Sequence, residues 1–247
     1  MNFFSLFKRK LIYKFKRKIL IDTDNIKLDN LDDLFHYYGS DKANVFKISN
    51  KPGHGYSKFY EKKLDRFKNK KINILEIGSF AGASAAAFAK YFPDSNVFCF
   101  DINISNFKFR SKNIQVFGID INNKKIVAQT LKFIFEKYQF SNFDLIIDDG
   151  SHNLSDILAG LKLFYKFLKM KGIYIIEDFK HPNYYKYNRN INHILIDDML
   201  KNLEMKNIFN SSVFNEEDQK TLISSIEKIE VFKGNLENSD ISFITKS

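Results

Sequence analysis

Two apolar runs of the sequence each end in a pair of carboxylates, and a histidine follows one of them. The run FDLIIDDGSH ends at Asp148 and Asp149, with His152 three residues later, and the run GIYIIEDF ends at Glu177 and Asp178. Both runs are typical of buried strands, and in an open parallel sheet ligands bind just beyond the carboxyl ends of such strands. The two acidic pairs therefore predict a binding site at this edge of the sheet.

Carboxylates gathered at one point repel one another unless a cation neutralises them. The ends of neighbouring strands lie only about 5 Å apart, so acids from both strands can reach one divalent ion. An oxygen-rich set without cysteine favours Mg²⁺ or Mn²⁺ over Zn²⁺. Spacing alone leaves Asp148 and Asp149 both open as the ligand from the first run. Helix capping and solvated turns are the alternative, which explains one acidic pair more easily than two.

His152 is the candidate general base, because an imidazole beside the acidic turn can accept a proton near neutral pH. Many single histidines have no chemical role, and that alternative stays open here. His54, His181 and His193 rank below His152 as candidates.

A glycine loop, LEIGSFAGAS, follows an earlier apolar run and opens a helical pattern. Gly78 and Gly82 would let the backbone turn tightly and approach a ligand, with Ser79 between them. Phe80 stands where a dinucleotide fingerprint has its second glycine, which counts against an NAD-dependent oxidoreductase. A loop with a purely structural role is the other interpretation.

Three acids accompany this loop. Glu76 lies inside the strand before the turn, where a carboxylate is costly unless it meets a donor such as an ammonium group. Asp101 closes the second strand, where an acid can accept hydrogen bonds from the hydroxyls of a ribose. Asp120 closes the third strand, with helix capping as its alternative role. These acids suit a ligand with a ribose, an adenine and an amine but no phosphate, and S-adenosylmethionine has that composition.

The elements that must position these residues follow from the alternation of short apolar runs with longer segments of helical period. This alternation predicts an α/β fold with a Rossmann-like, doubly wound sheet, mostly parallel, that ends in a C-terminal antiparallel strand. The expected strands are 72–78, 96–101, 114–120, 143–148 and 172–178, with a closing hairpin of 226–232 and 240–246. The expected helices are 82–92, 123–138, 153–169 and 193–205.

The motifs LEIGSFAG, DDGSH and IED, together with Asp101, resemble class I S-adenosylmethionine-dependent methyltransferases, and more narrowly the metal-dependent macrocin O-methyltransferase type. The upstream segment YYGSDKANVFKISNKPGHGYSKFYEKKL is similar to the lead-in of that group, and the resemblance runs from about Leu34 to the C-terminus. It implies methyl transfer from S-adenosylmethionine to a sugar hydroxyl. It also implies Asp149, Glu177 and Asp178 as ligands of Mg²⁺ or Mn²⁺.

The lead-in segment supplies three further candidates. His54 and Tyr56 would cover the methyl donor, and Lys42 would contact substrate or an acid. The acceptor would be a nucleotide-linked sugar or a surface glycan, which suit the positive charge of the chain, or a glycoside. The tyrosines of HPNYYKYNRN could stack on a sugar ring, and a mobile surface loop is the alternative for this segment. The expected donor-binding residues are Glu76, Gly78, Ser79, Gly82, Asp101, Asp120, Asp148 and Tyr56.

Composition limits the partners of this chain. It has 247 residues, a formal charge of +10, and 39 basic residues of which only five are arginine. Arginine is the usual reader of phosphate and guanine, so we expect no nucleic-acid partner. The single cysteine, Cys99, is expected in the core and suits a reducing, cytoplasmic compartment. Self-association is compatible with the sequence, which specifies no stoichiometry.

Residues 1–30 form a predicted basic extension before a catalytic domain of residues 31–247. The first twenty residues hold seven Lys or Arg and no acid, with Phe4, Phe7, Leu11 and Phe15 at helical spacing. The charges interrupt every apolar stretch, so neither a signal peptide nor a membrane span is expected. Two interpretations remain: a peripheral contact with the inner face of a membrane or a partner, and a plain helix docked on the domain. A non-catalytic binding module is the corresponding alternative function.

Overall fold

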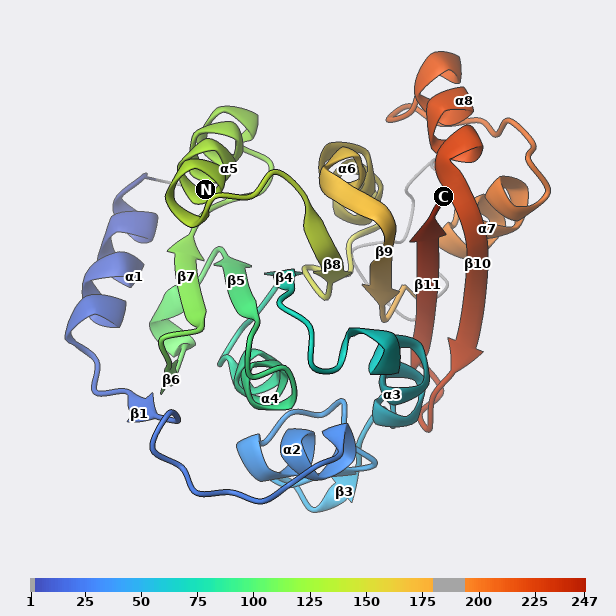
Figure 1. Ribbon diagram of the computed structural model, residues 1–247. Helices are drawn as coiled ribbons and strands as arrows, with labels where there is room; N and C mark the ends of the chain where they lie inside the picture. Colours follow the sequence, from blue (N-terminus) through green and yellow to red (C-terminus); the bar gives the residue numbers. More distant parts are fainter. Residues whose placement is uncertain (1–2, 180–193) are drawn as a thin grey trace. The chain divides into compact units, whose positions relative to one another are not determined.

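The chain folds into two compact units, residues 1–140 and 141–247. The computed structural model describes residues 3–179 and 194–247 (Figure 1). Helix α1 (Phe3–Phe15) belongs to the first unit, and the expected division at residue 30 stays a prediction.

Three parallel strands form the centre of the first unit, in the order β4 (Asn73–Ile77), β5 (Asn96–Asp101), β7 (Ile114–Gly118). Every residue of β4 is buried, as expected for a strand covered on both faces. Helices α4 (Ala83–Tyr91) and α5 (Lys124–Tyr138) lie on opposite sides of these strands (Figure 1). The alternating pattern of the sequence therefore produced the predicted doubly wound arrangement.

Shorter elements surround this centre. Asn30 caps α2, its side chain accepting a hydrogen bond from the backbone N–H of Asp33 at 2.8 Å. Helix α2 packs on α4 through the rings of Phe35 and Phe88, which meet edge to face at 5.4 Å. These elements are α2 (Leu31–Tyr38), α3 (Ser57–Leu64), the 3₁₀ turns η1 (Asp65–Phe67) and η2 (Ile104–Asn106), and the two-residue strands β1 (Ile19–Leu20), β2 (Val45–Phe46), β3 (Lys51–Pro52) and β6 (Phe109–Arg110).

The second unit contains four strands in the order β8 (Phe143–Asp148), β9 (Leu168–Glu177), β11 (Asp240–Lys246), β10 (Ile226–Lys233). Strands β8 and β9 are parallel, whereas β11 runs antiparallel to β9 and forms the predicted hairpin with β10. The other elements of this unit are α6 (Leu154–Phe164), η3 (Tyr165–Phe167), α7 (Ile196–Glu204) and α8 (Glu216–Ser225).

The predicted strands and the four predicted helices are all present, most with small shifts at their ends. The prediction for 153–169 was wrong at its end, because the α-helix stops at Phe164 and Leu168 already begins β9. The fold-class prediction of a mostly parallel sheet with a C-terminal antiparallel strand is confirmed. Cys99 is fully buried in β5, as expected. Among the residues that the structure describes, no helix is both long enough and apolar enough to cross a membrane.

Candidate active site

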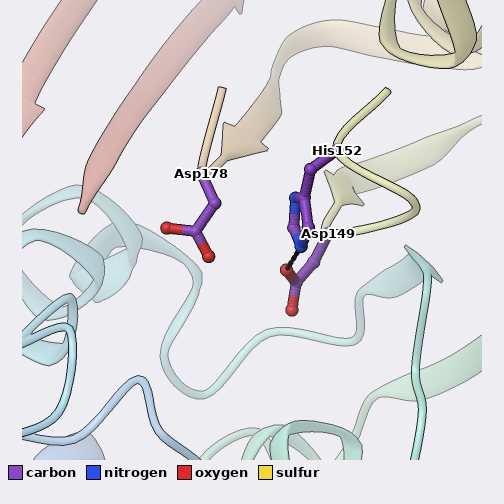
Figure 2. A group of neighbouring side chains, drawn as sticks. All are labelled: Asp149, His152 and Asp178. Atoms are coloured by element: carbon purple, nitrogen blue, oxygen red, sulfur yellow. Dashed lines mark ion pairs between the residues drawn. The ribbon is translucent and has the colours of Figure 1, made fainter. Parts of the chain in front are cut away.

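Three of the predicted site residues converge at the carboxyl ends of β8 and β9. Asp149, His152 and Asp178 each offer one ligand atom, and these atoms all lie within 4.8 Å of one another (Figure 2). The Nε2 atom of His152 lies 3.8 Å from Oδ1 of Asp149. Because β8 and β9 are adjacent and parallel, the turns that follow them meet at the same edge, which is the convergence that the acidic pairs predicted.

The backbone holds two of these residues in the left-handed region. The φ angles are 55° at His152 and 51° at Asp178, a conformation that costs a non-glycine residue free energy and is common at functional sites. Strand β11 secures Asp178, whose N–H donates to the carbonyl of Asp240 at 2.8 Å. On the other side, Asn153 caps α6 by accepting from the N–H of Ser155 at 3.0 Å. The turns are thus anchored by the elements next to them.

The structure separates Asp148 from Asp149. Asp148 is buried within the second unit, where its carboxylate accepts from the Tyr174 hydroxyl and from the Gly150 N–H, both at 3.3 Å. Burial raises the pKa of Asp148 to about 7, with the charges of Asp149 and Asp156 adding to the rise and the two hydrogen bonds opposing it. Geometry therefore favours Asp149 as the metal ligand, and the donor-binding role of Asp148 stays a prediction.

Glu177 is the last residue of β9 and is almost fully buried, with Ile241 opposite it on β11. It is not part of the group formed by Asp149, His152 and Asp178. The structure thus brings His152 among the ligand atoms, where the resemblance implied Glu177. The ligand role of Glu177 stays a prediction, and His152 has two roles to be tested, ligand and base.

The donor set of this cluster suits a divalent cation. Two carboxylates whose oxygens lie within 4.8 Å of each other repel, by roughly 3 kcal/mol at an effective dielectric constant of about 20. A bound cation removes that repulsion, and a set dominated by carboxylate oxygens is compatible with Mg²⁺ or Mn²⁺. Asp149 and Asp178 supply the oxygens that such an ion prefers.

The glycine loop of the first unit turns as tightly as its sequence predicted. Gly78, Phe80 and Gly82 have φ angles of 86°, 41° and 79°, and the N–H of Gly82 donates to the carbonyl of Ser79 at 2.7 Å. A Cβ atom on Gly82 would overlap the ring of Phe107. Glycine at position 82 is therefore required twice, by backbone conformation and by space.

Asp101 fastens this loop to the end of β5. Its Oδ2 accepts from the N–H of Phe80 at 2.7 Å, and its Oδ1 accepts from the N–H of Asn103 at 2.5 Å. Glu76 is fully buried and accepts from the hydroxyl of Ser84. The buried hydroxyl of Ser79 donates to the carbonyl of Glu76 at 3.3 Å. Two of the predicted donor-binding acids, Glu76 and Asp101, thus hydrogen-bond to the loop and to the start of α4.

The remaining candidates of the first unit occupy less direct positions. Asp120 accepts from the N–H of Asn122 at 3.0 Å, while Asn123 caps α5, so Asp120 forms the turn before the helix. Tyr56 is fully buried, and its ring lies 5.2 Å from that of His54. Lys42 is also buried. Their ligand contacts, including the cover expected from His54 and Tyr56, stay predictions. His181, His193 and the tyrosines of residues 181–190 lie outside the described residues.

The strand order of each unit, and the acids at the ends of its parallel strands, define the class I methyltransferase fold. Solved structures confirm it: the MycE methyltransferase from the mycinamycin biosynthetic pathway, in complex with Mg and SAH, superposes with a TM-score of 0.67 at 18% identity over 90% of this chain and 54% of that one. A second complex of that enzyme, with Mg, SAH and mycinamycin VI, gives a TM-score of 0.65 at 16% identity over 90% and 55% of the two chains.

Similar sequences narrow the resemblance. The mycinamicin VI 2''-O-methyltransferase of Micromonospora griseorubida is 26% identical over 51% of this chain and 31% of its own length. The demethylmacrocin O-methyltransferase of Streptomyces fradiae is 22% identical over 51% and 32%. No family model matches the chain. This chain matches only about a third of the length of these relatives, but they confirm the resemblance to macrocin-type O-methyltransferases.

Proposed function

We propose that this protein is a metal-dependent O-methyltransferase that transfers a methyl group from S-adenosylmethionine to a hydroxyl of a sugar. The observation that carries the proposal is the cluster of Asp149, His152 and Asp178 at the ends of β8 and β9, within a methyltransferase fold. The names of the relatives support a sugar acceptor: mycinamicin VI, demethylmacrocin and a rhamnosyl tetracenomycin are methylated by the proteins to which this chain is similar.

The residues of the second unit would bind and activate the acceptor. Asp149 and Asp178 would hold Mg²⁺ or Mn²⁺, which, when bound, chelates neighbouring hydroxyls and lowers the pKa of one of them. Nε2 of His152 would accept the proton from that hydroxyl. Glu177, buried beside Asp178 in the chain, would be a further ligand if the turn rearranges on metal binding.

The residues of the first unit would bind the donor. Glu76 would attract its amine, and Asp101 would accept hydrogen bonds from the ribose hydroxyls with the lone pairs that the backbone leaves available. The hydroxyl oxygen would form a bond to the sulfonium methyl of S-adenosylmethionine while the bond between that methyl and sulfur breaks. The sulfur would leave as a neutral thioether. Positioning of the two reactants would provide most of the acceleration.

Calorimetric titration tests the cofactor first. S-adenosylhomocysteine should bind the full chain, and NAD should give no heat of binding. Both titrations are run once in Mg²⁺ and once in chelator. Binding of NAD instead would replace the proposal with an oxidoreductase. If neither ligand binds, the proposed function fails.

The variant His152→Ala tests the base. It should reduce turnover by about 100-fold or more, the usual contribution of a general base, while S-adenosylhomocysteine affinity stays unchanged. His36→Ala, on the first unit's α2, is the matched control. Retained turnover in His152→Ala would remove this residue from the chemistry, whereas a parallel loss of Mg²⁺ affinity would make it a ligand.

The acceptor class and location extend the same proposal. A nucleotide-linked sugar, surface glycan or glycoside as acceptor would fit the positive charge of the chain. A cytoplasmic location would fit its single free cysteine.

We also propose that α1 brings the enzyme to the inner face of an anionic membrane. Size-exclusion chromatography with light scattering would determine whether a homo-oligomer forms.

A further inference from the structure

Helix α1 contacts the first unit through the side that carries Arg9 and Tyr13, and the ring of Tyr13 meets that of Phe107 edge to face at 6.3 Å. Arg9 donates to the carbonyl of Ile102 at 3.0 Å, and the Lys16 ammonium donates to the carbonyls of Ser105 and Asn106 at 2.9 and 3.0 Å. The side that carries Phe4, Phe7 and Leu11 is exposed. A helix that docks only to complete the core would have the opposite orientation.

The exposed apolar surface of the protein is concentrated on this segment. Of the eighteen large apolar side chains that are exposed in the described chain, seven lie between residues 4 and 20. Phe4 and Phe15 are 77% and 79% exposed. Such a concentration marks an interaction surface, because isolated exposed apolar residues would be scattered over the fold. The seven residues are Phe4, Phe7, Leu11, Ile12, Phe15, Ile19 and Leu20.

A basic cavity of about 990 Å³ lies directly beside this apolar segment. The parallel pairing of β1 with β6 creates it, because Leu20 lies opposite Arg110 and brings the N-terminal lysines next to a loop some ninety residues later in the chain. Asp22 is the only carboxylate among the described residues that line it. The cationic residues of the cavity are Lys14, Lys16, Arg17, Lys18, Arg110 and Lys112.

The positive charges of the cavity are poorly balanced. Asp22 already accepts from the hydroxyl of Ser111 at 2.5 Å and the N–H of Lys112 at 2.9 Å. Burial, followed by the charges of Arg110 and Lys16, lowers the pKa of Lys18. Six like charges around one hollow cost free energy that an anion would recover, and phosphate oxygens are the acceptors that arginine and lysine clusters match best.

We propose that this cavity binds the phosphate of an anionic lipid headgroup while the apolar residues of α1 and β1 insert into the lipid surface. Charge complementarity requires an anion, and the adjoining exposed phenylalanines indicate that the anion belongs to a lipid and not to a soluble phosphate. The site deepens the membrane part of the proposed function but needs no methyl transfer. It adds Arg110 and Lys112, which the N-terminal sequence alone would not suggest.

Vesicle co-sedimentation of the full chain tests this site. The protein should bind vesicles that contain phosphatidylglycerol and not vesicles of phosphatidylcholine alone. The double variant Arg110→Gln/Lys112→Gln should bind the anionic vesicles roughly 10- to 30-fold more weakly, because each of the two cations near the membrane surface raises the affinity several-fold. The matched control is Lys70→Gln/Lys71→Gln, two exposed lysines of the same unit outside the cavity, which removes the same net charge. Unchanged thermal unfolding would show that both variants fold.

The possible outcomes separate the cavity from the membrane contact. Equal weakening by both double variants would show that only net charge matters and would overturn the cavity site. Loss of binding in Phe4→Ser/Phe15→Ser, with full binding in Arg110→Gln/Lys112→Gln, would keep the membrane contact and reject the headgroup site. Glycerol phosphate that binds as tightly as vesicles would reject the lipid source. Methyl transfer to a soluble acceptor is measured separately, so failure of the proposed reaction would leave these results intact.

Discussion

The glycine loop of the first unit and the acidic cluster of the second are organised by opposite means. In the loop, Asp101 is satisfied by two backbone N–H groups, and its carboxylate stabilises the fold without any ligand. In the cluster, Asp149 and Asp178 place like charges within 4.8 Å, on turns that include two left-handed residues. One region is complete as folded, whereas the other holds repulsion that a cation would relieve.

Acids in similar sequence contexts are therefore expected to have opposite effects on stability. Both sets follow parallel strands, and both were expected to bind ligands. Removing charge from the loop should destabilise the protein, because backbone donors lose a charged acceptor. Removing charge from the cluster should stabilise the metal-free protein and weaken it only when metal is present. The following variants test this contrast.

Asp149→Asn should have the largest effect, on metal affinity. The loss of a ligand should weaken Mg²⁺ binding by at least about 100-fold, since even supporting residues of metal sites contribute that much. Thermal unfolding with and without Mg²⁺ measures it, because saturating metal at about 100 times its Kd stabilises a protein by roughly 2.7 kcal/mol. In chelator the variant should be as stable as the wild type or more stable, by up to about 1 kcal/mol after allowance for solvent. Lower stability in chelator would contradict the contrast.

Gly82→Ala should destabilise the first unit by about 2–4 kcal/mol, through left-handed strain together with overlap on the Phe107 ring. Gly39→Ala is the control, because Gly39 has the same left-handed φ of 80° but only ordinary contacts at 3.6 Å. Urea unfolding would compare the two, and Gly39→Ala should lose only about 1 kcal/mol. If both variants lose the same amount, close packing against Phe107 contributes nothing.

Asp101→Asn should have the smallest effect, a loss of about 1–2 kcal/mol of stability in the absence of any ligand. The amide keeps one acceptor oxygen, so either Phe80 or Asn103 loses its partner. Urea unfolding in chelator, beside Asp149→Asn, gives the direct comparison. A change of the same sign in both variants would show that the two acid sites are not organised differently.

Much of the fold could be predicted because apolar runs end sharply at polar residues. Strands β5 (Asn96–Asp101) and β8 (Phe143–Asp148) have the predicted ends, since a carboxylate closes each run. Helices α2, α3 and α8 were not predicted, because eight to ten residues give only two or three turns of periodic pattern. The pairing of β1 with β6 was also missed, since strands of two residues leave no periodic pattern.

The sequence predicted where the site lies in the fold, but it did not predict which residues form it. Successive strand residues point to opposite faces, so spacing could not decide whether Asp148 or Asp149 faces the cluster. The structure directs Asp148 toward Tyr174 and leaves Asp149 at the cluster. His152 lies beside Asp149 because its backbone is left-handed, and no local sequence motif indicates that conformation. Tertiary placement, which depends on the whole unit, determined both results.

The hydrogen bond from the N–H of Asp178 to the carbonyl of Asp240 links the acidic cluster to the C-terminal hairpin. When two paired strands separate locally in solution, the residues that their pairing holds are released. Opening of β11 would therefore free a proposed metal ligand, and bound metal would in turn keep the hairpin closed. Amide hydrogen exchange along residues 240–246 would then slow as metal is added. The exchange rate of the last strand and the affinity of the cluster would report one shared equilibrium.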